Sequence, residues 1–164
     1  MAQVMDEETR AFLAEIEHRR GGQISFRTFS TFYADNSGKL CQYGVFFYRV
    51  NGMFWFQDFE HVPSFLGFQL TKRRDEEYQM FESSFSPSDV VSIRKVWKKS
   101  VIRCVQNGKD FFKLRTFNPV LGILSESATE FTMKDGRLLY FQFMDRTVQE
   151  MIVKRMNKND TEGD

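Results

Sequence analysis

Cationic side chains are concentrated in one short stretch of the sequence. Five Lys and Arg and no acidic residue fall between positions 94 and 103, and Trp97 lies among them. This composition can hold anionic lipid headgroups or an acidic peptide, because clustered cations attract an anionic surface and an indole ring packs beside them. We favour the other interpretation, the solvated face of an edge strand, because alternating cations protect such a strand from pairing with another chain. The candidate contact residues are Arg94, Lys95, Lys98, Lys99 and Arg103.

Acid/base chemistry has a single candidate group in the sequence, formed by Asp58, Glu60 and His61. Asp58 and Glu60 are two positions apart, so on a strand they share one face, which suits a hydrolase and suits a solvated surface equally. The sequence contains no nucleophile elbow, P-loop or dinucleotide fingerprint. Its histidines and cysteines do not have the spacing of a zinc site. The sequence therefore predicts a non-enzymatic protein with no metal and no cofactor.

Phenylalanine is unusually frequent, with 19 residues among 164. Large rings favour half-buried pleated surfaces and supply much of the area of a hydrophobic core, so this content favours a β-rich fold. One apolar group has two interpretations. It belongs to the core, or it forms a contact surface for a partner or a second copy if the sheet is covered on one face only. We favour the core for this group, which comprises Phe54, Phe56, Phe65, Leu66 and Phe68.

Hydrophobic periodicity predicts the elements that must position these residues. Apolar positions at helical spacing, with Asp6 as a cap and Gly21-Gly22 as a stop, predict a helix over 6–20. Asn51-Gly52 predicts a type I′ hairpin turn, since both residues tolerate a positive φ. Apolar and polar residues alternate in most of the remaining segments. The predicted strands are 23–32, 40–50, 53–60, 78–85, 111–117, 129–133 and 138–144.

The basic stretch itself falls in a segment with mixed signals. Residues 91–105 are rich in β-branched side chains but contain Lys98-Lys99-Ser100 in the middle, which predicts two short strands or one strongly bent strand. Asn107-Gly108 then predicts a second type I′ turn. After the last strand, Asp145 and an apolar stripe predict a helix over 145–157.

Length and charge limit the class of protein. We expect one domain over 1–164, with an antiparallel β core over 23–144 and a flexible tail over 158–164. The net charge of +1 excludes the strongly basic footprint of a general nucleic-acid binder. No apolar run reaches about 18 residues and no signal sequence is evident, which predicts a cytoplasmic protein with two reduced, buried thiols, Cys41 and Cys104.

Two stretches carry a resemblance to a known superfold. Residues 85–93, Phe-Ser-Pro-Ser-Asp-Val-Val-Ser-Ile, are similar to the segment that leads into a mid-domain strand of pleckstrin-homology-like domains and their GRAM relatives. Residues 131–156 are similar to the last hairpin and helix of these domains. The resemblance implies a fold that is mainly β with α: a bent antiparallel sheet, or a partly open β-barrel or sandwich, capped by a C-terminal helix, with the N-terminal helix as an addition.

The same resemblance implies a non-enzymatic binding or adaptor module. Lipid-binding members carry a basic cluster in the first hairpin loop, whereas residues 34–39 of this chain hold one Lys and one Asp. We therefore expect a protein partner, with weak anionic-lipid contact through residues 94–103 as an addition. The alternative function is a small β-barrel that carries an apolar ligand, and a hydrolase is third. The sequence leaves self-association open.

Overall fold

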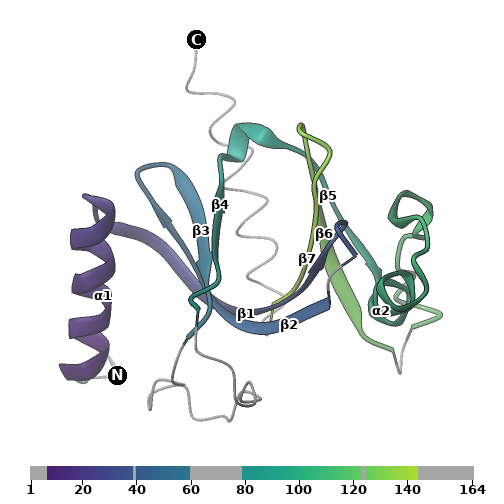
Figure 1. Cartoon of the computed structure of the whole chain (residues 1–164), viewed down its shortest axis with the longest axis horizontal. Coiled ribbons are helices and arrows are strands. Elements are labelled where there is room, and N and C mark those ends of the chain that lie inside the picture. The colour runs from purple at the N-terminus through teal and green to yellow at the C-terminus, as the bar shows by residue number, and fades with distance from the viewer. Residues whose placement is uncertain (1–6, 39, 60–78, 123–124, 144–164) are drawn as a thin grey trace.

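The computed structural model describes residues 7–38, 40–59, 79–122 and 125–143. Within them the chain is mainly β, with one seven-stranded antiparallel sheet and two α-helices. The sheet curls into a half-barrel (Figure 1) with the strand order β4-β3-β2-β1-β7-β6-β5. The helices and 3₁₀ turns are α1 (Glu7–Arg20), η2 (Pro87–Asp89), α2 (Lys98–Asn107) and η3 (Phe111–Lys113). The strands are β1 (Ile24–Asp35), β2 (Leu40–Val50), β3 (Met53–Gln57), β4 (Glu82–Phe85), β5 (Val90–Trp97), β6 (Ser127–Met133) and β7 (Leu138–Phe143).

Phenylalanine rings on the concave face hold the curl of the sheet. Phe85 on β4 contacts Phe131 on β6 with ring centroids 5.7 Å apart, although four strands separate β4 from β6 in the sheet order. Such a contact is attainable only when the two ends of the sheet bend toward each other. Phe141 on β7 lies at the centre, with its ring 5.0 Å from Phe56 and 5.4 Å from Phe47. The main core is therefore a continuous cluster of rings inside the half-barrel.

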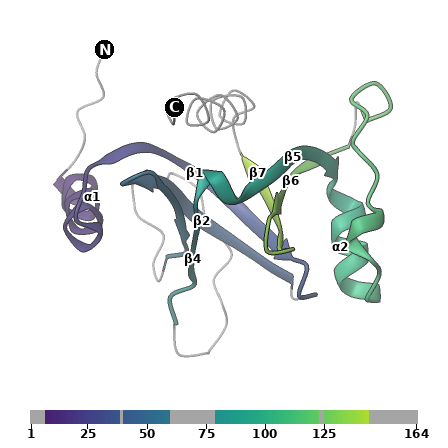
Figure 2. The ribbon, with the colours of Figure 1, turned by 90° about the horizontal axis from the view of Figure 1, so that it is seen from above.

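The convex face carries two separate smaller cores. Side chains alternate along β2, so Phe46 and Tyr48 lie opposite Phe47 and meet Leu13 and Ile16 of α1. At the other end of the sheet, α2 buries Val101 and Cys104 against a second cluster that includes Val96, Ala128 and Tyr140. The two helices thus lie at opposite ends of the molecule (Figures 1 and 2).

Several predicted elements are confirmed with nearly the predicted bounds. The helix predicted over 6–20 spans Glu7–Arg20, and the strand predicted over 40–50 spans Leu40–Val50. Asn51 and Gly52 have φ angles of 49° and 79°, as a type I′ turn requires. The last hairpin forms between β6 and β7. Cys41 and Cys104 are free thiols, Cys104 buried and Cys41 half-buried.

The prediction of strands over 91–105 is wrong in its second half, because β5 ends at Trp97 and α2 follows directly. The β-branched residues favoured a strand locally. However, Val101 and Cys104 are three apart, so a helix places both on one face where they bury against the sheet, and this packing overrides the local preference. Gly108 has a φ of 61° and donates its N–H to the Cys104 carbonyl, so it ends the helix and forms no hairpin.

The strand predicted over 111–117 is also wrong. Asp110 Oδ1 accepts the Phe112 N–H at 2.9 Å and starts the 3₁₀ turn η3. The only strand-like pairing in the described part of that segment is an isolated bridge between Val96 and Thr116. β4 is shorter than predicted and spans Glu82–Phe85. The predicted helix 145–157, the tail 158–164 and the residues Phe65, Leu66 and Phe68 lie outside the described residues.

Replacement of Phe141 by alanine tests the central position of its ring. We expect a loss of about 3–5 kcal/mol in the free energy of unfolding, because the variant leaves a cavity among five phenylalanine rings. Urea unfolding followed by circular dichroism measures the loss. Phe112→Ala, at a ring 66% exposed to solvent, is the matched control and should change stability by less than about 0.5 kcal/mol. Equal losses in the two variants would contradict this description of the core.

Candidate functional site

The structure divides the five predicted cations among different environments. Arg94 lies on the convex face of β5 and its Nε donates to Glu130 Oε1 at 2.6 Å. Lys95 lies on the opposite face, beside Thr129. Lys98 forms an ion pair with Glu126, and its ammonium lies 5.0 Å from the centre of the Tyr33 ring. Lys99 and Arg103 are exposed on α2.

Arg94, Glu130 and Tyr140 form a polar triad around the buried Glu130 side chain. Glu130 is 2% exposed, and its carboxylate accepts from the guanidinium of Arg94 and from the Tyr140 hydroxyl at 2.9 Å. The hydrogen bond to Glu130 raises the pKa of Arg94. Burial and then the neighbouring carboxylate raise the pKa of Tyr140 far above its ordinary value. The Arg94 guanidinium and the Tyr140 hydroxyl thus both donate hydrogen bonds to Glu130, so Arg94 has a partner within the fold.

Lys98 is likewise used within the fold. Partial burial lowers the pKa of Lys98, but hydrogen bonds to Glu126 and Tyr33 more than offset this effect and leave the pKa raised. The hydrogen bond from Lys98 lowers the pKa of Glu126 in turn. The Lys98 N–H also donates to the Glu126 carbonyl at 3.1 Å, so this contact fixes the start of α2 to the start of β6.

A groove of about 660 Å³ lies between α2 and the segment after it, and we call it the basic groove. Its described lining residues include four cations and no carboxylate. Burial raises the pKa of the Cys104 thiol, so this part of the groove carries no thiolate at neutral pH. The lining consists of Arg103, Lys109, Lys113 and Arg115 together with Trp97, Ser100, Cys104 and Leu114.

The groove cations have little internal compensation. Lys113 lies 3.7 Å from Asp110, and both side chains are well exposed, so this pair is weak. Among the residues that the structure describes, Lys99, Arg103 and Arg115 take part in none of the ion pairs found. Lys99 also lies in the first turn of α2, where a cation is opposed by the helix dipole.

Sequence reasoning found Arg103 and missed the other three groove cations, Lys109, Lys113 and Arg115. The predicted basic stretch ended at residue 103 because the following segment was interpreted as a turn and a strand. The local excess of positive charge could have identified these three residues. Residues 94–115 contain eight Lys and Arg and one acidic residue, Asp110, in a chain whose net charge is only +1.

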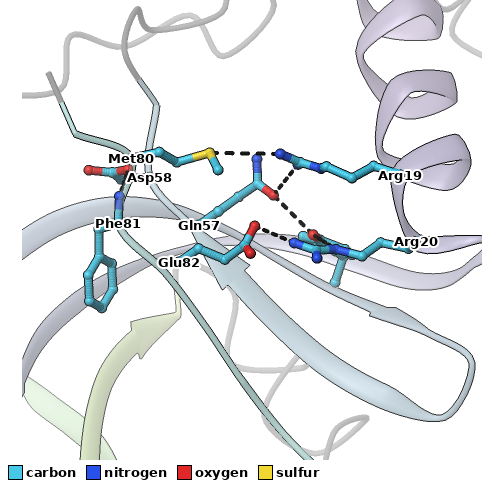
Figure 3. Close-up of polar contacts among 8 residues, drawn as sticks. Arg19, Arg20, Gln57, Asp58, Met80, Phe81 and Glu82 are labelled. Carbon is cyan, nitrogen blue, oxygen red and sulfur yellow. Dashed lines mark hydrogen bonds and ion pairs between the residues drawn. The ribbon is translucent and has the colours of Figure 1, made fainter.

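A second polar cluster joins the end of α1 to the sheet (Figure 3). Arg20 forms an ion pair with Glu82, donates to the Tyr48 hydroxyl at 3.1 Å and stacks 3.6 Å above the Trp55 ring. Arg19 donates to Gln57 Oε1 at 2.8 Å. Both guanidinium groups are thus occupied by partners on β2, β3 and β4, and the cluster attaches α1 to this side of the sheet.

Asp58, the candidate acid/base residue, has a structural role at the same place. Its Oδ1 accepts the Phe81 N–H at 2.7 Å, and its own N–H donates to the Phe81 carbonyl at 3.0 Å. The side chain is buried and extends the pairing of β3 with β4 (Figure 3). Glu60 and His61 lie outside the described residues.

Phe54 and Phe56 do not form the apolar contact surface that was the alternative interpretation of this group. Both side chains are 0% exposed and belong to the concave core, as the favoured interpretation had it. The curl of the sheet encloses this face, which removes the surplus apolar area that a partner surface would require. These two residues are therefore structural.

Comparisons with known proteins do not assign this chain to a family. No protein-family model, curated protein or solved structure matches this chain. Within the described residues, no helix is long and apolar enough to span a bilayer, and no three His, Cys, Asp or Glu gather where they could bind a metal ion. The function is therefore inferred from the geometry of the chain itself.

Replacement of Arg94 by methionine tests the buried triad. We expect a loss of about 1.5–3 kcal/mol in the free energy of unfolding, because the buried Glu130 side chain then loses the hydrogen bonds from a guanidinium that is itself partly exposed. The double variant Arg94→Met/Glu130→Leu removes that carboxylate and should recover most of the loss. Chemical unfolding of the three proteins at pH 7 provides the comparison, and an Arg94→Met variant as stable as the wild type would show that the pair is dispensable.

The raised pKa of Tyr140 predicts a fall in stability at alkaline pH. Below about pH 10 the phenol is protonated in both states, whereas above it the unfolded chain loses this proton and the folded chain keeps it, so rising pH favours unfolding. Unfolding free energies at pH 9, 10 and 11 measure the slope. Tyr140→Phe should have a shallower slope than the wild type, and an identical slope would refute the assignment.

Proposed function

We propose that this chain is a non-enzymatic binding module that docks an anionic partner through the basic groove. The observation that carries the proposal is the set of four cations that line the groove with no carboxylate among the described lining residues. A surface with one sign of charge raises the local concentration of an oppositely charged partner and speeds its association. The pleckstrin-homology-like resemblance supports the same class of protein, since a strongly curled antiparallel sheet is what it implies.

The contrast between the groove cations and the other cations of the fold supports a binding role. Arg20 is held by Glu82 and the Tyr48 hydroxyl, and Arg94 is held by Glu130, so both contribute to the structure. Lys99 and Arg103 face solvent on α2, and Lys99 opposes the helix dipole. Lys99 attracts Glu126 and Lys113 meets Asp110 only at the exposed surface, so an external anion would compensate most of the remaining positive charge at this end.

The first hairpin loop supports docking at the groove rather than in that loop. Asn36 Nδ2 donates to the Gly136 carbonyl at 3.0 Å, and Asn36 Oδ1 accepts the Leu138 N–H at 3.1 Å. Asp35 Oδ1 accepts the Ser37 N–H at 2.8 Å. The polar groups of the described part of this loop thus bond within the protein, and the loop lacks the basic cluster of lipid-binding relatives.

The packing of the half-barrel supports a surface function over the carriage of an apolar ligand. In the described part of the concave face, phenylalanine rings lie in contact with one another across β2, β3 and β7. In this described part, aromatic side chains thus occupy space that a carrier would keep for its ligand.

Binding of a fluorescein-labelled peptide of 16 glutamates tests the proposal. Fluorescence anisotropy should show binding that weakens as salt rises from 50 to 300 mM, because the contact is electrostatic. Lys99→Glu/Arg103→Glu should bind at least about tenfold more weakly, since two attractive charges become repulsive.

The matched control is Arg10→Glu/Lys134→Glu, which makes the same change of charge at exposed positions on α1 and in the β6–β7 turn. It should bind nearly as well as the wild type. A wild type that does not bind, or equal weakening in both double variants, would overturn the assignment of the groove.

A further inference from the structure

Three large apolar side chains project into solvent at the same end of the molecule as the basic groove. Phe112 is 66% exposed, and Val120 and Leu121 are each 76% exposed, the highest values among the large apolar residues described. They belong to η3 and to the turn that follows it, and both segments lie with α2 at the end opposite α1 (Figures 1 and 2).

Local hydrogen bonds hold Phe112 in this outward position. Asp110 Oδ1 accepts the Phe112 N–H, which fixes the 3₁₀ turn. The neighbouring Phe111 points inward, with its ring 5.7 Å from that of Tyr140, and Leu114 is buried in the same core. Because the turn directs these two side chains into the core, Phe112 must face water.

The turn around Val120 and Leu121 is fixed in a similar way. Asn118 Oδ1 accepts the Val120 N–H at 3.0 Å, and the Ser125 N–H donates to the Gly122 carbonyl at 2.9 Å. A Cβ on Gly122 would lie 2.5 Å from the Phe117 ring, so only glycine permits this close approach. The ring of Phe117 in turn packs 4.6 Å from that of Trp97. The apolar pair is therefore presented by a turn that is anchored to the groove wall.

We infer that the anionic partner is the surface of a lipid bilayer. The four groove cations, together with Lys99 next to the lining residue Ser100, contact acidic headgroups. Phe112 and the pair Val120 and Leu121 enter the boundary between headgroups and acyl chains. This inference rests on the proposed function, because it names the partner of the same groove.

The arrangement of the apolar residues favours a bilayer over an acidic peptide. A peptide in the groove uses the cations and leaves the two projecting turns in water. Protein interfaces bury a contiguous apolar centre, whereas here the apolar residues lie on two separate turns among cations. A bilayer surface accepts both at once, since its headgroups are anionic and its interior is apolar.

Sedimentation with vesicles tests the inference. We compare phosphatidylcholine vesicles with vesicles that contain 30% phosphatidylserine, at 100 mM salt. The wild type should sediment with the anionic vesicles and remain in solution with the neutral ones. Lys99→Glu/Arg103→Glu and Phe112→Ser/Leu121→Ser should each reduce the bound fraction at least fivefold. Circular dichroism verifies that both variants are folded.

The control Met80→Ser/Val91→Ser removes two exposed apolar side chains elsewhere and should bind as the wild type does. A further variant, Leu121→Trp, reports insertion by its difference from the wild type, in which Trp55 and Trp97 already fluoresce. The difference spectrum should shift to shorter wavelength on anionic vesicles and not with the glutamate peptide. A normal bound fraction for Phe112→Ser/Leu121→Ser, or no shift for Leu121→Trp, would overturn the insertion.

The outcomes separate the two proposals. Binding of the glutamate peptide without binding of vesicles overturns the bilayer inference and leaves the anionic groove in place. If Lys99→Glu/Arg103→Glu reduces the bound fraction on vesicles and Phe112→Ser/Leu121→Ser does not, the insertion of the apolar residues is overturned. Absence of binding to both probes refutes the groove and the bilayer together.

Discussion

Packing of phenylalanine rings on one face of a single sheet is the constraint on which the rest of this structure depends. The rings of β4 and β6 meet across four intervening strands, so the sheet must curl for its concave face to become a core. Once the sheet is curled, the alternate side chains of the same strands stand on a convex face that is too wide for one helix. Two helices cover its two ends, each over a separate small cluster.

The cationic side chains at the α1 end and at the α2 end of the molecule differ in their partners. At the α1 end, Arg19 and Arg20 are joined to Gln57, Tyr48 and Glu82, and the charges are compensated inside the protein. At the α2 end, Arg94 and Lys98 pair with Glu130 and Glu126, and Lys113 forms a weak, exposed pair with Asp110. The next cations after Lys98 along the chain lie around the basic groove, and the most exposed apolar side chains described stand beside them. The two ends of the described structure therefore differ in how they hold their cations, and we propose that the α2 end is the one that meets an anionic surface.

The α2 end also shows how local contacts fix the course of an irregular segment. Residues 109–122 contain no described strand, yet Asp110, Asn118 and Gly122 fix their turns by local hydrogen bonds and close packing. Phe111 and Leu114 anchor the segment in the core of α2. A projecting Phe112 is the direct result of this anchoring, because adjacent residues in a tight turn cannot all point inward.

Local chemistry in the sequence determined the α1 helix, the Asn51-Gly52 turn, the last hairpin and the predominance of strands, since caps, turn residues and periodicity act over a few positions. Tertiary structure alone decided that Lys98–Asn107 is a helix, because burial of Val101 and Cys104 outweighs the strand preference of their neighbours. It also decided which cations remain available. Arg94 meets Glu130 from 36 positions away, and the groove gathers Arg103 and Arg115 from different segments, which no local pattern specifies. The sequence gives the positions of the charged residues, whereas the tertiary structure determines which of them pair with one another.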